Sequence, residues 1–394
     1  MNDAKRPLII TSLSIASILL MIAIYFVPIW WVALTAPNYP EAAFPDGVRI
    51  NFHMNGVFNG CSLVVKDEIN EEEALDCVHE MDTINHYVGM YPIAAGGPIE
   101  RGFSPFLITL LIIMVIGFAI SNPKRRRIFL IIAFTGNAVW MTMTIYKTDG
   151  IKYENEGYLY ALMNQLDQDA NDKTLGLDVK PMDSTKALKQ LKASLAGKNY
   201  KDEVTDEQSA ESSKEEQVDE KTRLIEELQS TYENDLSNGR VSEPWKGNAY
   251  QLMAWHYGKV LGRYFNNQDE IRPMVKKLRL ATNIVYFGLL GAMLLLIVVG
   301  TRSKNNLIYW LMVLVPMALP VFFVIDYSAW LWWYGHTLNS MGAFTVKPFM
   351  PTVFGEGKVA QFATFSYPSI GFALMMVNSI ILAAIALMRR KESL

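Results

Sequence analysis

Residues Asn51–Pro98 read NFHMNGVFNGCSLVVKDEINEEEALDCVHEMDTINHYVGMYPIAAGGP. This stretch holds both cysteines of the 394-residue chain and three of its five histidines. It lies between two apolar segments, Leu8–Val27 and Pro105–Ile120, and the second needs its flanking residues to reach across a bilayer. We therefore expect a small folded cap, residues 29–104, that is mounted on membrane helices.

Six apolar segments of about 20 residues are candidate membrane spans. They are Leu8–Val27, Pro105–Ile120, Ile128–Tyr146, Leu280–Gly300, Leu307–Ile325 and Pro368–Met388. The first is too long and too uniformly apolar for the core of a signal peptide, so we expect it to remain as an anchor. The chain is thus predicted to be a mainly α, polytopic membrane protein that contacts the lipid bilayer.

Basic residues predict the orientation of these spans, because short cytoplasmic connections are rich in Lys and Arg. Such residues precede the first span and follow the second, fourth and sixth, at Lys5–Arg6, Lys124–Arg127, Arg302–Lys304 and Arg389–Lys391. Both termini are then cytoplasmic, and the large loops face the periplasm of a bacterium with the spans in its inner membrane. The predicted order is an anchor (1–28), the cap (29–104), a span hairpin (105–146), a periplasmic segment (147–279), a second hairpin (280–325), a Trp-rich periplasmic loop (326–367) and a last span with its tail (368–394).

The cap is predicted to be α+β. Val48–Phe52 and Ser62–Val65 have strand-like composition, and Asn59-Gly60 is a turn signal between them. Asn70 is a suitable N-cap for a helix that runs to about Val88, and three glutamates after it suit the positive end of the helix dipole.

The two cysteines are expected to form a disulfide in an oxidising compartment. Cys77 shares the apolar face of the predicted helix with Met81, and Cys61 follows the predicted turn. A bond between Cys61 and Cys77 would tie helix to hairpin. The rival interpretations are a soft Cu(I) site that uses Cys77 and Met81 with Cys61, and two unpaired thiols.

A second helix face carries His79, Asp82 and His86, at positions i, i+3 and i+7. Two imidazoles and a carboxylate along two turns suit Zn or Cu, with Met81 as a further copper ligand and His53 as a third imidazole. The simpler interpretation is a solvated or interfacial face whose histidines hydrogen-bond to neighbours. Copper is the cofactor that this pattern suggests.

Two aromatic stretches are candidate docking surfaces for a partner. They contain Trp330, Trp332, Trp333, Tyr334 and His336 in the first, and Trp255 and His256 in the second. A membrane-interface belt explains the first without a partner, and packing explains the second. Pro316 and Pro320 precede the first stretch and predict a kink in the fifth span.

The periplasmic segment 147–279 has an acidic centre. Lys201–Arg240 contains thirteen acidic and five basic residues, so it cannot bury enough apolar surface to offset chain entropy. We expect it to be partly helical, with Thr222–Tyr232 as the best helix, and partly disordered. Amphipathic helices are predicted on either side, at Ile151–Gln168 and within Trp245–Asn267.

Several kinds of chemistry find no support in the sequence. No predicted span carries an ionisable residue except near its ends, which argues against a permease or a proton pump. No CxxCH, P-loop, G-x-S-x-G or HExxH motif occurs. We therefore expect no enzyme activity, and the acidic balance argues against nucleic acid as a partner.

Two stretches carry a resemblance to a known family. CVHEMDTINHYVGMYP at Cys77–Pro92, and TVKPFMPTVFGEGKVAQF at Thr345–Phe362 followed by TFSYP, resemble NosB-type polytopic membrane proteins of clade II nitrous oxide reductase gene clusters. The resemblance implies a non-catalytic accessory subunit that anchors, helps assemble or delivers electrons to a periplasmic copper enzyme, nitrous oxide reductase. It brings no catalytic residues. The alternatives are a periplasm-facing copper-binding or copper-delivery protein and, more weakly, a permease.

Overall fold

The computed structural model describes residues 6–62, 64–65, 72–73, 76–171, 209–298, 307–343, 347–359 and 361–393. These residues are mainly helical. They divide into two compact units, the first made of residues 1–161 and 244–394 and the second of residues 162–243. All the candidate membrane spans belong to the first unit.

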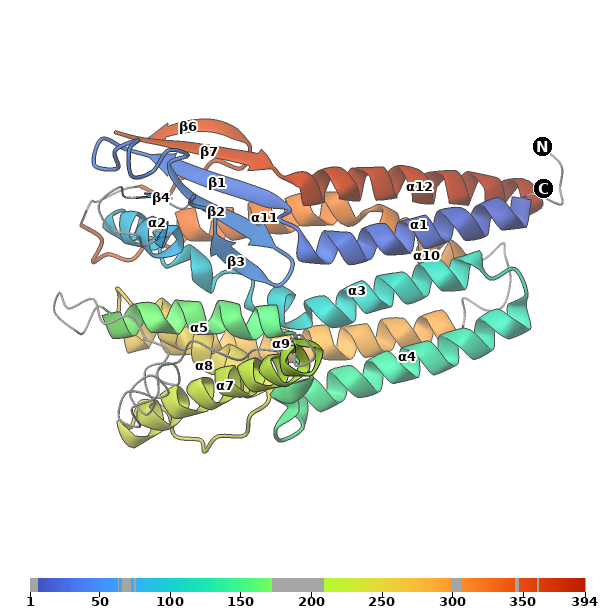
Figure 1. Ribbon diagram of the computed structural model, residues 1–394, viewed down its shortest axis with the longest axis horizontal. Helices are drawn as coiled ribbons and strands as arrows, with labels where there is room; N and C mark the ends of the chain where they lie inside the picture. The colour runs from blue at the N-terminus through green and yellow to red at the C-terminus, as the bar shows by residue number, and fades with distance from the viewer. Residues whose placement is uncertain are drawn as a thin grey trace. The chain divides into compact units, whose positions relative to one another are not determined.

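Six candidate spans are present among the described residues, of which five are single helices and one is a bent pair (Figure 1). They are α1 (Arg6–Phe26), α3 (Pro98–Ala119), α4 (Pro123–Tyr146), α9 (Gln268–Val298), α12 (Ile370–Ser393) and the pair α10 (Leu307–Met317) with α11 (Leu319–His336). Their length and apolar composition indicate a multi-pass membrane protein, as the sequence predicted. The greatest difference is at α9, which begins twelve residues earlier than expected because its first turns pack on α8 (Ala249–Leu261).

Helix α3 is the centre of the helical bundle. It contacts α1, α4, α9 and α10, and 72% of its apolar window is buried, against 22–33% for the other single spans. The other helices therefore keep one broad apolar face exposed, as expected of helices that contact lipid. Within the bundle, Ser17 of α1 donates to Asn378 of α12 over 2.6 Å, which satisfies two buried polar groups.

The fifth span breaks where its prolines predicted. Helices α10 and α11 meet at an angle of 62°, between Pro316 and Pro320. The prediction that the outer loop begins at Asp326 is wrong, because α11 continues to His336. The Trp-rich stretch is therefore helical.

An antiparallel sheet pairs strands from the first part of the chain with strands from the last part (Figure 1). Its order is β3-β2-β1-β7-β6, with β1 (Trp30–Thr35), β2 (Val48–His53), β3 (Gly56–Asn59), β6 (Gly355–Val359) and β7 (Phe362–Pro368). Strand β1 follows α1 directly, and β7 leads directly into α12. Helices α1 and α12 pack against each other, and the strands next to them, β1 and β7, pair in the sheet. The cap is thus completed by residues near the C-terminus.

Strand β1, which follows the first span, was not predicted from the sequence. Trp30 is buried against Tyr327 and Phe372 and donates to the Ser366 hydroxyl over 2.9 Å. The prediction missed β1 because its residues, WWVALT, are apolar without alternation. Such a run is typical of a strand that is covered on both faces.

The cap helix is shorter than predicted. Helix α2 spans Cys77–Tyr87 and is capped by Asp76, whose side chain accepts from the N–H groups of Val78 and His79. The predicted start at Asn70 is wrong, because Glu72–Glu73 forms strand β5, which pairs with β4 (Val64–Val65). The predicted end is confirmed, since the chain leaves the helix at Gly89 with a φ of +86°.

The hairpin of the cap also differs from the prediction. Strand β2 matches Val48–Phe52, but it pairs with β3 through a turn at Met54-Asn55. Asn59-Gly60, the predicted turn, ends β3 instead. The segment 345–367, expected to be a loop, contains the β6–β7 hairpin.

Two further helices belong to the segment expected to be periplasmic. Helix α5 (Glu156–Asn171) follows a short 3-10 helix, η3 (Gly150–Tyr153). Helix α7 (Ser209–Ser237) contains the predicted helix Thr222–Tyr232, and Leu224, Leu228 and Tyr232 are buried along one side of it. The first residues of the acidic centre, 201–208, lie outside the described residues, so the expected partial disorder of Lys201–Arg240 stays a prediction.

Candidate functional site

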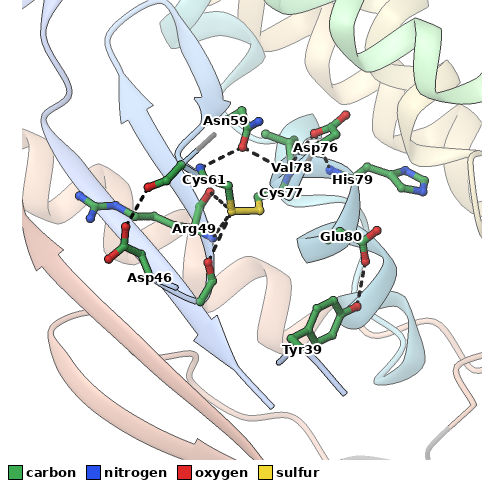
Figure 2. The surroundings of a disulfide bond; sticks show 12 residues. Tyr39, Asp46, Arg49, Asn59, Cys61, Asp76, Cys77, Val78, His79 and Glu80 are labelled. Atoms are coloured by element: carbon green, nitrogen blue, oxygen red, sulfur yellow. Dashed lines mark hydrogen bonds between the residues drawn. A yellow bond between two sulfur atoms is a disulfide. The ribbon is translucent and has the colours of Figure 1, made fainter. Parts of the chain in front are cut away.

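The disulfide between Cys61 and Cys77 is present, which confirms the first interpretation of the two cysteines (Figure 2). Cys61 lies just after β3, and Cys77 is the first residue of α2. The Asn59 side chain accepts from both cysteine N–H groups, over 3.1 and 3.3 Å. Because both sulfurs are bonded to each other, they are not the thiolates that a Cu(I) site would need.

The apolar face of α2 packs into the core of the cap. Cys77, Met81 and Ile84 are buried together with residues of β1 and β2 and with Tyr327 and Leu331 of α11, as the helical periodicity predicted. Met81 is therefore surrounded by apolar side chains of the core. This position separates it from the polar face that carries the histidines.

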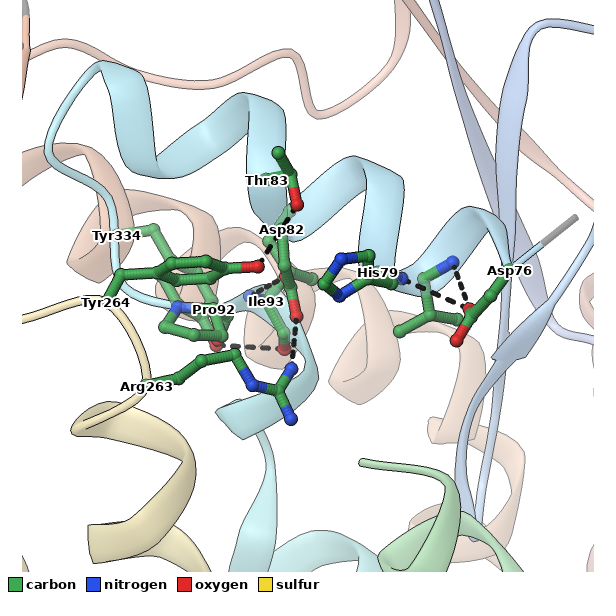
Figure 3. A network of polar contacts seen from close by, with 10 residues as sticks. Asp76, His79, Asp82, Thr83, Pro92, Ile93, Arg263, Tyr264 and Tyr334 are labelled. Atoms are coloured by element: carbon green, nitrogen blue, oxygen red, sulfur yellow. Dashed lines mark hydrogen bonds and ion pairs between the residues drawn. The ribbon is translucent and has the colours of Figure 1, made fainter. Parts of the chain in front are cut away.

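Asp82 is the most buried polar group of α2, and two partners hold it (Figure 3). Its Oδ1 accepts the N–H of Ile93 over 2.7 Å, and its Oδ2 lies 3.9 Å from the Arg263 guanidinium, which is also buried. Burial raises the pKa of Asp82 to about 7, although Arg263 and the Ile93 and Ala94 N–H groups act in the opposite direction. Asp82 thus ties α2 to the segment that follows α8.

The two histidines of this face are half-buried and do not converge with Asp82 on one point. His86 stacks on Tyr264, with ring centroids 4.5 Å apart, and Tyr264 in turn hydrogen-bonds Thr83 over 3.2 Å. The Nδ1 atoms of His79 and His86 are buried and have no hydrogen-bond partner among the described residues. Within the described part of the chain, no three His, Cys, Asp or Glu side chains form a metal-binding group. His53, the proposed third imidazole, packs on Phe58 in the hairpin.

A second polar network fixes the loop after α2, and sequence analysis missed it. Tyr91 donates to Glu270 over 2.7 Å, and the Asn339 amide donates to the same carboxylate over 2.9 Å. The Asn339 N–H also donates to the carbonyl of Gly89 over 2.8 Å. Burial is the main cause that raises the pKa of Tyr91 to about 12. Three distant segments are thereby joined, and no sequence spacing relates them.

The aromatic end of α11 divides between buried and exposed side chains. Tyr334 is buried and donates to the carbonyls of Pro92 and Ile93. Trp330 and Trp333 are half-buried and pack on each other, with centroids 5.7 Å apart. Trp332 and His336 are exposed and stacked, at 4.4 Å. Of the five residues predicted to dock a partner here, two are therefore on the surface.

The other predicted docking pair is not on the surface. Trp255 and His256 lie in α8 and are 7% and 2% exposed. Helix α8 is buried on nearly all sides because it packs against both α3 and α9. Its aromatic residues serve this packing, which was the simpler of the two interpretations.

Exposed apolar side chains also occur outside the aromatic residues that were predicted to dock a partner. Tyr87, Met341 and Met350 are 45%, 71% and 46% exposed, and we refer to these three as the exposed apolar set. Tyr87 is the last residue of α2. The nearby Gly89 carbonyl accepts the N–H of Asn339, and the Asn339 side chain accepts the N–H of Met341, so the loop with Met341 is held close to the end of α2. Met350 follows Phe349, whose backbone N–H donates to the carbonyl of Gly335 near the end of α11. Met341 and Met350 lie outside helices and strands, so no periodicity could reveal their exposure, and Tyr87 is the last residue of α2.

No protein-family model, curated protein sequence or solved structure matches the chain.

Proposed function

We propose that the chain is a non-catalytic membrane subunit that docks a soluble periplasmic copper enzyme on its cap. The resemblance of residues 77–92 and 345–368 to NosB-type proteins suggests that this enzyme is a nitrous oxide reductase. The cap would anchor the enzyme at the inner membrane or help to assemble it.

The proposed orientation has two supports. Basic residues lie at the ends of the spans that are remote from the cap, which favours cytoplasmic termini. The Cys61–Cys77 bond belongs to an oxidising compartment, and the periplasm is one. The cap would thus face the periplasm.

The observation that carries the docking proposal is the exposed apolar set. Exposed apolar side chains can bury their surface against a partner, and methionine adapts to a partner's shape because its side chain is unbranched and flexible. The backbone beneath Tyr87 and Met341 is held by the hydrogen bonds of Asn339. A surface held in this way loses little conformational entropy when a partner binds.

The test is purification of the tagged chain from its native membranes in mild detergent. We expect a nitrous oxide reductase to co-elute near one to one, and the double variant Met341→Glu/Met350→Glu to lose it. The control is Tyr160→Glu, which places the same charge at an exposed aromatic residue outside the set. Purification without the enzyme, or equal recovery with all variants, would refute the proposal.

Copper binding is the second candidate, and one observation favours it. His79 and His86 lie on the same helix, and their Nδ1 atoms have no hydrogen-bond partner within the described part of the chain. A copper ion bound by the solitary protein, and lost in His79→Ala/His86→Ala, would support this function over docking. A copper content below one per ten chains after growth with copper would exclude it.

A further inference from the structure

A cavity of about 270 Å³ lies where the membrane helices meet the cap. Its walls come from β2 and β3, from the first turns of α3, from α11 and from Met375 of α12. Most of the lining is apolar or aromatic, including Phe322, Phe323 and Tyr327. A volume of this size accommodates a ring with a few substituents. Three of its walls are candidate membrane spans.

Arg101 is one of the residues that line this cavity, and its guanidinium has a donor without an acceptor among the described residues. The side chain is 5% exposed, and its Nε donates to the carbonyl of Gly97 over 3.2 Å. Its Nη1 atom is buried and makes no hydrogen bond with the described residues. A buried guanidinium N–H without a partner is costly, so the site is suited to an oxygen atom supplied by a ligand.

The other charged groups determine which kind of oxygen fits. Glu100 and Asp326 line the same cavity, and their carboxyl groups interact directly with each other. Glu100 also accepts from the Trp330 indole over 3.3 Å and interacts electrostatically with Arg101. One positive charge thus faces two acidic groups, and an anionic ligand would add repulsion.

His53 does not alter this balance. Its imidazole lines the cavity from the cap side, and burial lowers its pKa, so the ring carries no charge at neutral pH. The expected occupant is therefore uncharged, apolar over most of its surface and equipped with an acceptor oxygen. The aromatic walls favour a flat ring, which stacks on them, over an acyl chain.

We propose that this cavity binds a membrane-soluble quinone, with a ring carbonyl oxygen that accepts a hydrogen bond from Arg101. The carbonyl supplies the missing acceptor, and the ring occupies the aromatic part of the cavity. The acyl ester of a membrane lipid shares the carbonyl chemistry, so the experiment includes it as a competitor.

The probe is decylubiquinone, added to the purified full chain in detergent. Binding is measured as saturable quenching of tryptophan fluorescence, to which Trp330 in the cavity wall contributes. We expect Arg101→Met to weaken binding about tenfold, the effect of one hydrogen bond to a charged donor, and Arg101→Lys to weaken it less. Val57→Phe, which fills the cavity from β3, should weaken binding without touching Arg101. Lys152→Met, which removes an exposed charge elsewhere, is the control.

Three outcomes would overturn the proposal. The first is an absence of saturable quenching in the unmodified chain. The second is equal affinity in the Arg101→Met, Val57→Phe and Lys152→Met variants. The third is reversal of the quenching by monoolein at a concentration below the dissociation constant of decylubiquinone, which would assign the cavity to a lipid ester. Quenching that persists in excess monoolein would support the quinone.

Discussion

Replacing Asp82 with asparagine tests the buried tie between α2 and Arg263. The carboxyl group is 1% exposed, and burial raises its pKa from the ordinary 3.8 to about 7. Asparagine keeps an oxygen for the Ile93 N–H, which Asp82 accepts over 2.7 Å. The substitution therefore removes the ionisable group while it preserves the main hydrogen bond.

The raised pKa fixes the sign of the pH dependence. Between pH 3.8 and about 7 the folded protein keeps the Asp82 proton and the unfolded chain has released it. The free energy of unfolding must therefore fall as pH rises through this window, by about 1.4 kcal/mol per pH unit. Between pH 5 and pH 7 the loss due to Asp82 is about 3 kcal/mol, and above pH 7 it levels off.

The assay is equilibrium unfolding in detergent at pH 5, 6, 7 and 8, for the unmodified chain and for Asp82→Asn. The variant should gain stability relative to the unmodified chain as pH rises, by about 3 kcal/mol in total. The control is Asp76→Asn at the start of the same helix, where the carboxyl is exposed and asparagine is an equally good cap. A difference between Asp82→Asn and the unmodified chain that does not change with pH, or that changes in the opposite direction, would refute the reasoning.

Three further substitutions test the cap. Replacing Cys61 and Cys77 with serine should lower the free energy of unfolding by about 3 kcal/mol, since their bond closes a loop with a sequence separation of 16; equal denaturation midpoints for oxidised wild type and variant would contradict this. Gly89→Ala should cost about 1–3 kcal/mol, because φ is +86° and the new Cβ would lie 2.7 Å from the Asn339 carbonyl oxygen. Gly288→Ala, whose Cβ meets nothing within 4 Å, is its control and should not destabilise. Asn339→Ala should cost about 1–3 kcal/mol in the same unfolding assay, because it leaves Glu270 with fewer donors; an unchanged midpoint would show that the network is not structural.

Two features of the candidate site were predictable from the sequence: the buried face of α2 and the disulfide. The periodicity of α2 placed Cys77 and Met81 in the core and separated them from His79 and His86. The role of Asp82 was not predictable, because its partner Arg263 lies far along the chain and no spacing relates the two. The metal interpretation of His79, Asp82 and His86 stays a prediction, with Asp82 already engaged in an ion pair.

By itself, the sequence determined the candidate membrane spans, the bend at Pro316 and Pro320, and the pairing of the two cysteines. These features are local, since they depend on the length of an apolar run, on the missing N–H of proline and on the number of thiols. Only the tertiary structure decided that β1 and β7 pair. Neither strand alternates clearly, and their partners are more than 300 residues apart. The same holds for the cavity at Arg101, whose walls come from segments throughout the first unit, and long-range packing is not encoded in any short stretch.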